Sequence, residues 1–141
     1  MEKVIVNNGR HCPLVNIASV EEKYNAKFVG QFCLKTIDGT WADAPADVYY
    51  VANPNKELGH SHYFGIIVRN STVYITKGDS GVEGSIYAVI ADDGEVLYSK
   101  YRHDFNESKD KSVWIDGGRD YTRTSSPTIE LKIVDGEFYK V

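Results

Sequence analysis

The stretch from Ile86 to Tyr101 decides the fold and reads IYAVIADDGEVLYSKY. Two segments rich in β-forming residues, 86–91 and 96–101, flank Asp92-Asp93-Gly94. Glycine adopts the positive φ angles that tight turns require, so an aspartate-glycine connection between such segments is a strong signal for a β-hairpin. The stretch therefore predicts two antiparallel strands.

Similar signals lie on both sides of this hairpin. Asn70-Ser71 and Asp135-Gly136 are each flanked by β-forming segments. The strands predicted in addition are residues 28–36, 48–51, 63–69, 73–76, 129–134 and 138–141. The least regular stretches are residues 53–61, 77–85 and 105–126, and loops on a rigid β-scaffold commonly carry binding residues.

One short helix is predicted ahead of these strands. Ser19-Val20-Glu21-Glu22 fits a capping box, in which the serine accepts a hydrogen bond from a backbone N–H and Glu22 reaches back. The helix is expected to run to about Lys27. No change of composition separates two domains, so residues 1–141 are predicted to form a single domain. Its predicted class is α+β: a predominantly antiparallel, barrel-like β-sheet with one short N-terminal helix.

Composition and charge limit the function. The chain has 16 basic and 20 acidic residues, and the whole net charge of −4 lies in residues 71–141. A protein that binds long nucleic acids through a basic surface is therefore not expected. No segment reaches the roughly 18 apolar residues of a membrane helix, and no secretory signal is visible, so a soluble cytoplasmic protein is expected. Cys12 and Cys33 are then expected to be reduced.

The motifs of common enzymes and metal sites are missing from the sequence. There is no phosphate-binding loop and no nucleophile elbow, so no catalytic residue and no cofactor are predicted. His60 and His62 alternate and could ligate a metal together. A third ligand at ordered spacing is missing, so two polar residues at the start of a strand are the favoured interpretation and no metal is expected.

Two segments, residues 98–105 and 114–123, interleave aromatic, cationic and short polar side chains. Arginine forks match phosphate oxygens, aromatic faces hold nucleobases, and aspartate accepts from ribose hydroxyls. Together these side chains suit a nucleotide pocket. The alternative is ordinary structure: ion pairs of Arg102 with Asp104 or of Arg119 with Asp116 or Asp120, and a turn at residues 116–118.

These segments also resemble a phage family. The resemblance lies in the order of four blocks, residues 63–65, 90–99, 101–104 and 113–123, and is firmest in the last two, which read YRHD and VWIDGGRDYTR. Over roughly residues 60–125 the chain is similar to the first class of Thoeris anti-defence proteins. These small phage-encoded proteins act as sponges for an immune signal.

The resemblance implies sequestration rather than catalysis, so the protein is not expected to be an enzyme. Family members bind cyclic ADP-ribose isomers, such as glycocyclic ADP-ribose, that bacterial TIR-domain proteins make. They hold the molecule intact in the cytoplasm of the infected bacterial host, and the NAD-cleaving effector is not activated. They assemble as homo-oligomers, dimers or hexamers. Some are also associated with cyclic di- or trinucleotides at separate sites, and the sequence leaves a second site open.

The chemistry of such a ligand indicates a set of candidate binding residues. The phosphates would be held by arginine, the base by an aromatic ring and the hydroxyls by aspartate; the candidates are Arg102, Arg119, Arg123, Tyr63, Phe64, Tyr101, Asp116 and Asp120. Two other functions stay open. One is a hydrolase of small nucleotides that uses His60, His62 or His103 as acid or base, and the other is a β-rich protein-interaction module.

Overall fold

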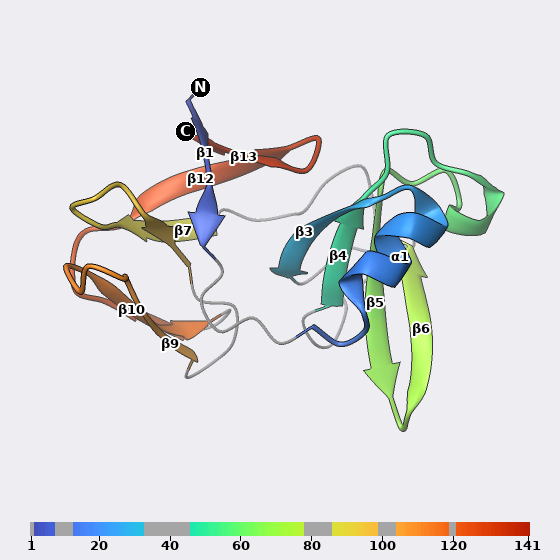
Figure 1. The fold of residues 1–141 in the computed structure, drawn as a ribbon, viewed down its shortest axis with the longest axis horizontal. Helices are drawn as coiled ribbons and strands as arrows, with labels where there is room; N and C mark the ends of the chain where they lie inside the picture. The colour runs from blue at the N-terminus through green and yellow to red at the C-terminus, as the bar shows by residue number, and fades with distance from the viewer. Residues whose placement is uncertain (1, 8–12, 33–45, 78–85, 99–103, 119–120) are drawn as a thin grey trace. The chain divides into compact units, whose positions relative to one another are not determined.

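The computed structural model describes residues 2–7, 13–32, 46–77, 86–98, 104–118 and 121–141 (Figure 1). The chain divides into two compact units. The N-terminal unit is Cys12–Glu83, and the C-terminal unit combines Met1–His11 with Gly84–Val141. Mostly antiparallel strands, with one parallel pair, one α-helix and one short 3-10 helix make up the regular structure of the described residues, so the predicted α+β class is confirmed. That the two units act as a single domain stays a prediction.

The N-terminal unit is a four-stranded antiparallel sheet in the order β3-β4-β5-β6 with one helix, α1. Its elements are α1 (Ile17–Tyr24), β3 (Lys27–Phe32), β4 (Ala46–Tyr50), β5 (Tyr63–Arg69), β6 (Thr72–Lys77) and the 3-10 turn η1 (Lys56–Leu58). The predicted hairpin at Asn70-Ser71 is confirmed. Both turn residues have positive φ, 50° and 64°, as a two-residue hairpin turn requires.

Helix α1 begins earlier than the sequence predicts. Asn16, not Ser19, is its N-cap: the Asn16 Oδ1 accepts a hydrogen bond from the backbone N–H of Ser19 at 3.1 Å. Asparagine is among the best N-caps, and a start at Ile17 lets that side chain join the apolar side of the helix. The helix also ends before the predicted Lys27, because Asn25 turns left-handed with a φ of 50° and β3 follows.

The core of the N-terminal unit lies between α1 and the sheet. Its buried cluster is Tyr49, Val51, Leu58, Phe64 and Ile66, and partly buried side chains from residues 15–28 pack against it. Burial, together with the charges of Asp47 and Glu21, raises the pKa of the Tyr49 hydroxyl, which therefore stays protonated. The apolar side of α1 is thus partly buried against residues of strands β4 and β5.

The C-terminal unit contains a six-stranded sheet in the order β1-β13-β12-β7-β8-β2. Its strands are β1 (Lys3–Val4), β2 (Val6–Asn7), β7 (Ile86–Ile90), β8 (Val96–Leu97), β12 (Ile129–Val134) and β13 (Glu137–Lys140). The hairpins predicted at Asp92-Asp93-Gly94 and Asp135-Gly136 are confirmed as antiparallel pairs. The strand predicted over 96–101 ends at Leu97, and Ser99–Tyr101 lie outside the described residues.

A second sheet of this unit comes from residues that the sequence predicts to be irregular. It has three antiparallel strands, β9 (Asp104–Glu107), β10 (Trp114–Gly118) and β11 (Tyr121–Thr124), in the order β11-β10-β9. The alternative of a turn at Asp116-Gly117-Gly118 is therefore wrong. All three residues pair with β11, and Asp116 and Gly117 also pair with β9. Val113 and Ile115 join Val89, Ala91 and Leu97 in a buried cluster.

No helix within the described ranges could span a bilayer. Helix α1 has 8 residues, and none of the helices there combines the length and apolarity of a membrane span.

Candidate functional site

Two of the predicted ligand-binding residues meet on the three-stranded sheet. Asp116 of β10 lies directly opposite Arg123 of β11. The Arg123 Nη2 donates a hydrogen bond to the Asp116 Oδ2 at 2.9 Å. The ordinary-structure alternative pairs Asp116 with Arg119, which lies outside the described residues. The strand register accounts for the pair with Arg123, because opposite residues in an antiparallel pair share a face.

An aromatic residue extends this pair into a row across all three strands. Phe105 of β9 lies directly opposite Asp116 on its other side. Trp114, two residues before Asp116, lies on the same face, since side chains alternate along a strand. The ring centroids of Phe105 and Trp114 are 5.8 Å apart with an interplanar angle of 32°. We call Phe105, Trp114, Asp116 and Arg123 the outer face.

The opposite side of this sheet is buried. Asn106 and Ile115, which are paired on β9 and β10, point away from the outer face and are almost inaccessible. On the outer face, Phe105 is 42% exposed, and the Arg123 side chain is 62% exposed against 17% for Asp116. The sheet therefore anchors one face in the core and presents an aromatic ring and a guanidinium to solvent.

The electrostatics of the outer face permit exchange of partners. An ion pair this exposed contributes only about 0–1 kcal/mol to stability, because solvent screens it and ordering two side chains costs entropy. Phosphate oxygens match the guanidinium fork as well as carboxylate does. A phosphate could therefore take the place of the Asp116 carboxylate as the hydrogen-bond partner of Arg123 at little cost in folding free energy.

A network of hydrogen bonds fixes the hairpin that carries Phe105 and Trp114. Within the β9–β10 turn, Asp110 Oδ1 accepts from the Ser108 hydroxyl at 2.7 Å, and from the Ser112 N–H and hydroxyl at 2.9 and 2.7 Å. These bonds, that from Ser108 first, lower the pKa of Asp110 to about 2. Asp110 Oδ2 also accepts from the N–H of Asp93 at 3.2 Å, which ties this turn to the β7–β8 turn.

Two other predicted residues are buried in the N-terminal unit instead. Phe64 is fully buried, with its ring stacked on Tyr49 at 5.2 Å and 5.1 Å from the ring of Tyr24. Tyr63 is also buried, and its ring centroid lies 5.3 Å from that of Tyr50. Rings covered in this way offer no face to a nucleobase, so we assign Tyr63 and Phe64 to the core and correct the prediction that they hold the base.

The remaining predicted residues, Tyr101, Arg102, Arg119 and Asp120, lie outside the described residues. Sequence reasoning missed the roles of Phe105 and Trp114, although both belong to the segments it singled out. Apolar-polar alternation would have misplaced them, because in β9 the apolar Phe105 is exposed while the polar Asn106 is buried. Only the strand pairing shows which face of this sheet is buried.

The two described histidines, His60 and His62, lie in different local settings. His62 Nδ1 lies 2.9 Å from the Val51 carbonyl oxygen, which can only accept, so this nitrogen is the donor. His62 stands just before β5, as the strand-start interpretation predicts, while His60 has a left-handed φ of 61° in the turn after η1. Among the residues that the structure describes, no three His, Cys, Asp or Glu side chains are grouped suitably for a metal ion.

Comparisons with protein-family models, curated proteins and solved structures find no match for this chain. The observations that bear on function are therefore the chemistry of the outer face and the resemblance in sequence.

Proposed function

We propose that the protein binds a small nucleotide of the cyclic ADP-ribose class at the outer face and holds it intact. The observation that carries the proposal is the row of Phe105, Asp116 and Arg123 across three strands, with Trp114 beside it. A cyclic ADP-ribose isomer has an adenine face, two phosphate charges and several ribose hydroxyls. The row offers an aromatic ring, a guanidinium and a carboxylate for these groups.

The spacing of the row supports this assignment. Neighbouring strands lie about 4.8 Å apart, so Phe105 and Arg123 are separated by two such steps, or about 10 Å. This is close to the span from the base to the phosphates of a nucleotide. Stacking of adenine on Phe105 would therefore bring the phosphates near Arg123, with Asp116 between them for a ribose hydroxyl.

Charged residues close in sequence to the outer face are further candidates for the site. Arg102 precedes β9 by two positions, and Arg119 and Asp120 connect β10 to β11 along the chain. Tyr101 precedes Arg102. We retain these four residues as candidate ligand contacts, since each is close in sequence to a strand that carries the row.

The strength that a sponge needs favours more than one protein surface around the ligand. Nanomolar affinity corresponds to about −12 kcal/mol. One stacked base contributes about 1–3 kcal/mol and a charged hydrogen bond about 1.5–3 kcal/mol, so a single exposed face falls short. The proposal therefore includes a homo-oligomer, a dimer or hexamer as in the Thoeris anti-defence class, and action in the cytoplasm of an infected bacterial host.

The test is calorimetric titration with cyclic ADP-ribose isomers, followed by heating of the complex and analysis of the released molecule. Tight binding and release of unchanged ligand support the proposal. A linear product would instead indicate the hydrolase alternative, in which His60, His62 or His103 acts as acid or base. Absence of binding and of any thermal shift would favour the protein-interaction alternative. Titration with cyclic di- and trinucleotides, alone and after saturation, tests for a second site.

A further inference from the structure

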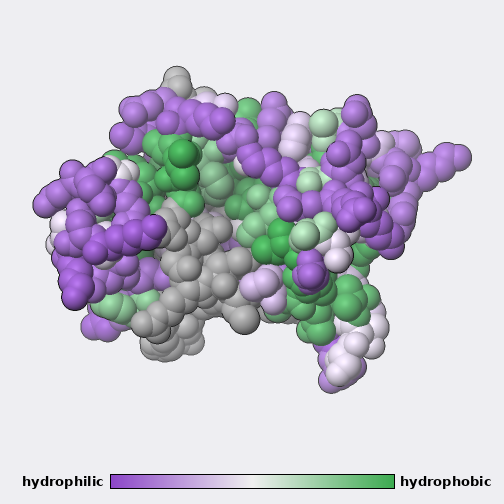
Figure 2. Space-filling view, viewed as in Figure 1, coloured by the Kyte–Doolittle hydropathy of each residue, from purple (hydrophilic) through white to green (hydrophobic). Residues whose placement is uncertain are grey.

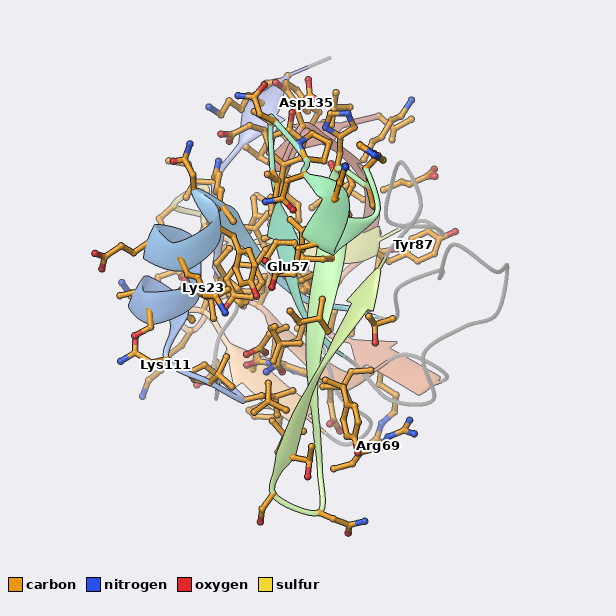
Figure 3. All side chains as sticks on the ribbon, turned by 90° about the vertical axis from the view of Figure 1, so that its right-hand side faces the viewer. Lys23, Glu57, Arg69, Tyr87, Lys111 and Asp135 are labelled. Carbon is orange, nitrogen blue, oxygen red and sulfur yellow. The ribbon has the colours of Figure 1, made fainter. Side chains whose placement is uncertain are left out.

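Strand β6 forms an exposed apolar edge of the N-terminal sheet. Within the described part of the chain it pairs with β5 alone, so its other side presents backbone N–H and C=O groups. Val73 is 53% exposed, Tyr74 51% and Ile75 37%. Figure 2 shows apolar residues gathered over the lower part of the β5–β6 hairpin, and Figure 3 shows this hairpin from the side, with Arg69 labelled near its end.

The centre of β6, residues 72–76, lacks the sequence features that usually keep an edge strand from pairing with another chain. Such edges commonly carry a proline, a bulge or an inward lysine. Residues 72–76 include neither proline nor a charged side chain, and β6 keeps an unbroken register with β5 from Thr72 to Lys77. By contrast, the β3–β4 pair has a register shift between Phe28 and Gly30. Among the residues that the structure describes, therefore, nothing blocks this edge from pairing with another strand.

The sequence of β6 identifies the strand that fits. Residues 72–76 read Thr-Val-Tyr-Ile-Thr, which is symmetric in residue class about Tyr74. We propose that β6 pairs antiparallel with β6 of a second copy of this chain, about a two-fold axis at Tyr74. Each β-branched residue then lies opposite a β-branched residue, and each threonine opposite a threonine, which are favourable cross-strand pairs.

The faces and charges of β6 agree with this register. Val73 and Ile75 lie opposite Val68 and Ile66 of β5, so they share one face of the sheet. The two-fold axis preserves that face, and Val68, Val73 and Ile75 of the two copies form one continuous apolar surface. Lys77, the only charged residue of β6, lies opposite Ser71 of the second copy, so no like charges oppose each other.

This proposal does not depend on a ligand, and its test is made without one. The mass of the full chain is measured by sedimentation equilibrium over a range of concentrations, with circular dichroism to verify folding. We expect a dimer for the unmodified chain. Tyr74→Lys and Tyr74→Glu each place two like charges at the axis and should weaken the dimer on the order of a hundredfold. Tyr74 is exposed, so both variants should fold.

Mixing the two variants provides the decisive measurement. Tyr74→Lys and Tyr74→Glu should each lose the β6–β6 association alone and regain it when mixed, because opposite charges then meet at the axis. Tyr87→Lys, at an exposed tyrosine of β7, is the matched control and should leave the dimer unchanged. A monomeric unmodified chain, a dimer that persists in both variants, or failure of the mixture to associate would each overturn the proposal. A monomer that binds another protein through β6 would assign the edge to a different partner.

Discussion

The Nη2 of Arg123 and the Oδ2 of Asp116 are 2.9 Å apart, across two strands that the sequence does not predict. Phe105 lies opposite Asp116 on the neighbouring strand, and the Arg123 side chain is 62% exposed. A cation, an anion and an aromatic ring thus lie side by side on one face of a three-stranded sheet, and the proposed nucleotide site rests on this arrangement.

Removal of the Arg123 guanidinium should lower the affinity for the ligand but leave the stability of the fold nearly unchanged. Arg123→Ala is expected to change the free energy of unfolding by less than about 1 kcal/mol, because the ion pair is exposed. Affinity for a cyclic ADP-ribose isomer should fall about 10- to 100-fold with the loss of a charged hydrogen bond. Urea unfolding and calorimetric titration measure the two quantities. Arg69→Ala, at an exposed arginine of β5, is the control, and unchanged affinity in Arg123→Ala would contradict the site.

Truncation of Phe105 should weaken binding by the loss of stacking. Phe105→Ala is expected to cost about 1–3 kcal/mol of binding free energy, whereas Phe105→Tyr keeps the ring and should bind nearly as the unmodified chain does. Because Phe105 is partly exposed, both variants should unfold at similar denaturant concentrations. Equal affinities for the alanine and tyrosine variants would show that the base lies elsewhere.

Substitution of Phe64 tests its assignment to the core. Phe64→Ala should lower the free energy of unfolding by about 3–5 kcal/mol, because a fully buried ring is replaced by a cavity. Phe64→Leu preserves more of the volume and should cost less. Ligand affinity of the folded Phe64→Leu variant is expected to be unchanged. A large loss of affinity without loss of stability would return this residue to the ligand site.

Asp110 should make stability depend on pH. Its pKa is lowered to about 2 in the folded chain, against 3.8 as its ordinary value, so the folded state releases the proton more readily than the unfolded state does. The stabilisation is therefore complete above about pH 4 and is lost as the pH falls toward 2. Thermal unfolding of Asp110→Asn should differ from that of the unmodified chain most near neutral pH.

The difference between the two melting temperatures should shrink progressively through this acidic range. Asp135→Asn, in the turn between β12 and β13, serves as the comparison because Asp135 is also an exposed turn aspartate. If Asp110→Asn melts with the unmodified chain at every pH, the network around Asp110 does not hold the two turns together.

Local chemistry explains which elements could be predicted. The hairpins at Asn70-Ser71, Asp92-Asp93-Gly94 and Asp135-Gly136 depend on a few turn residues beside clear β-forming segments, and all three form. The helix was predicted but placed wrongly at both ends, since Asn16 competes with Ser19 as the cap. Strands β1 and β2 have 2 residues each, too few to show alternation.

By itself, the sequence determined the antiparallel hairpins, the α+β class and the segments where cations and aromatic rings concentrate, because turns and strand propensity act between neighbours in the chain. Only the tertiary structure decided which rings are buried and which face solvent. Phe64 and Phe105 are the same residue type in β-forming surroundings, yet one is enclosed by Tyr49 and Tyr24 while the other lies beside Asp116 on an open sheet. That distinction depends on strand register and on packing between residues distant in sequence.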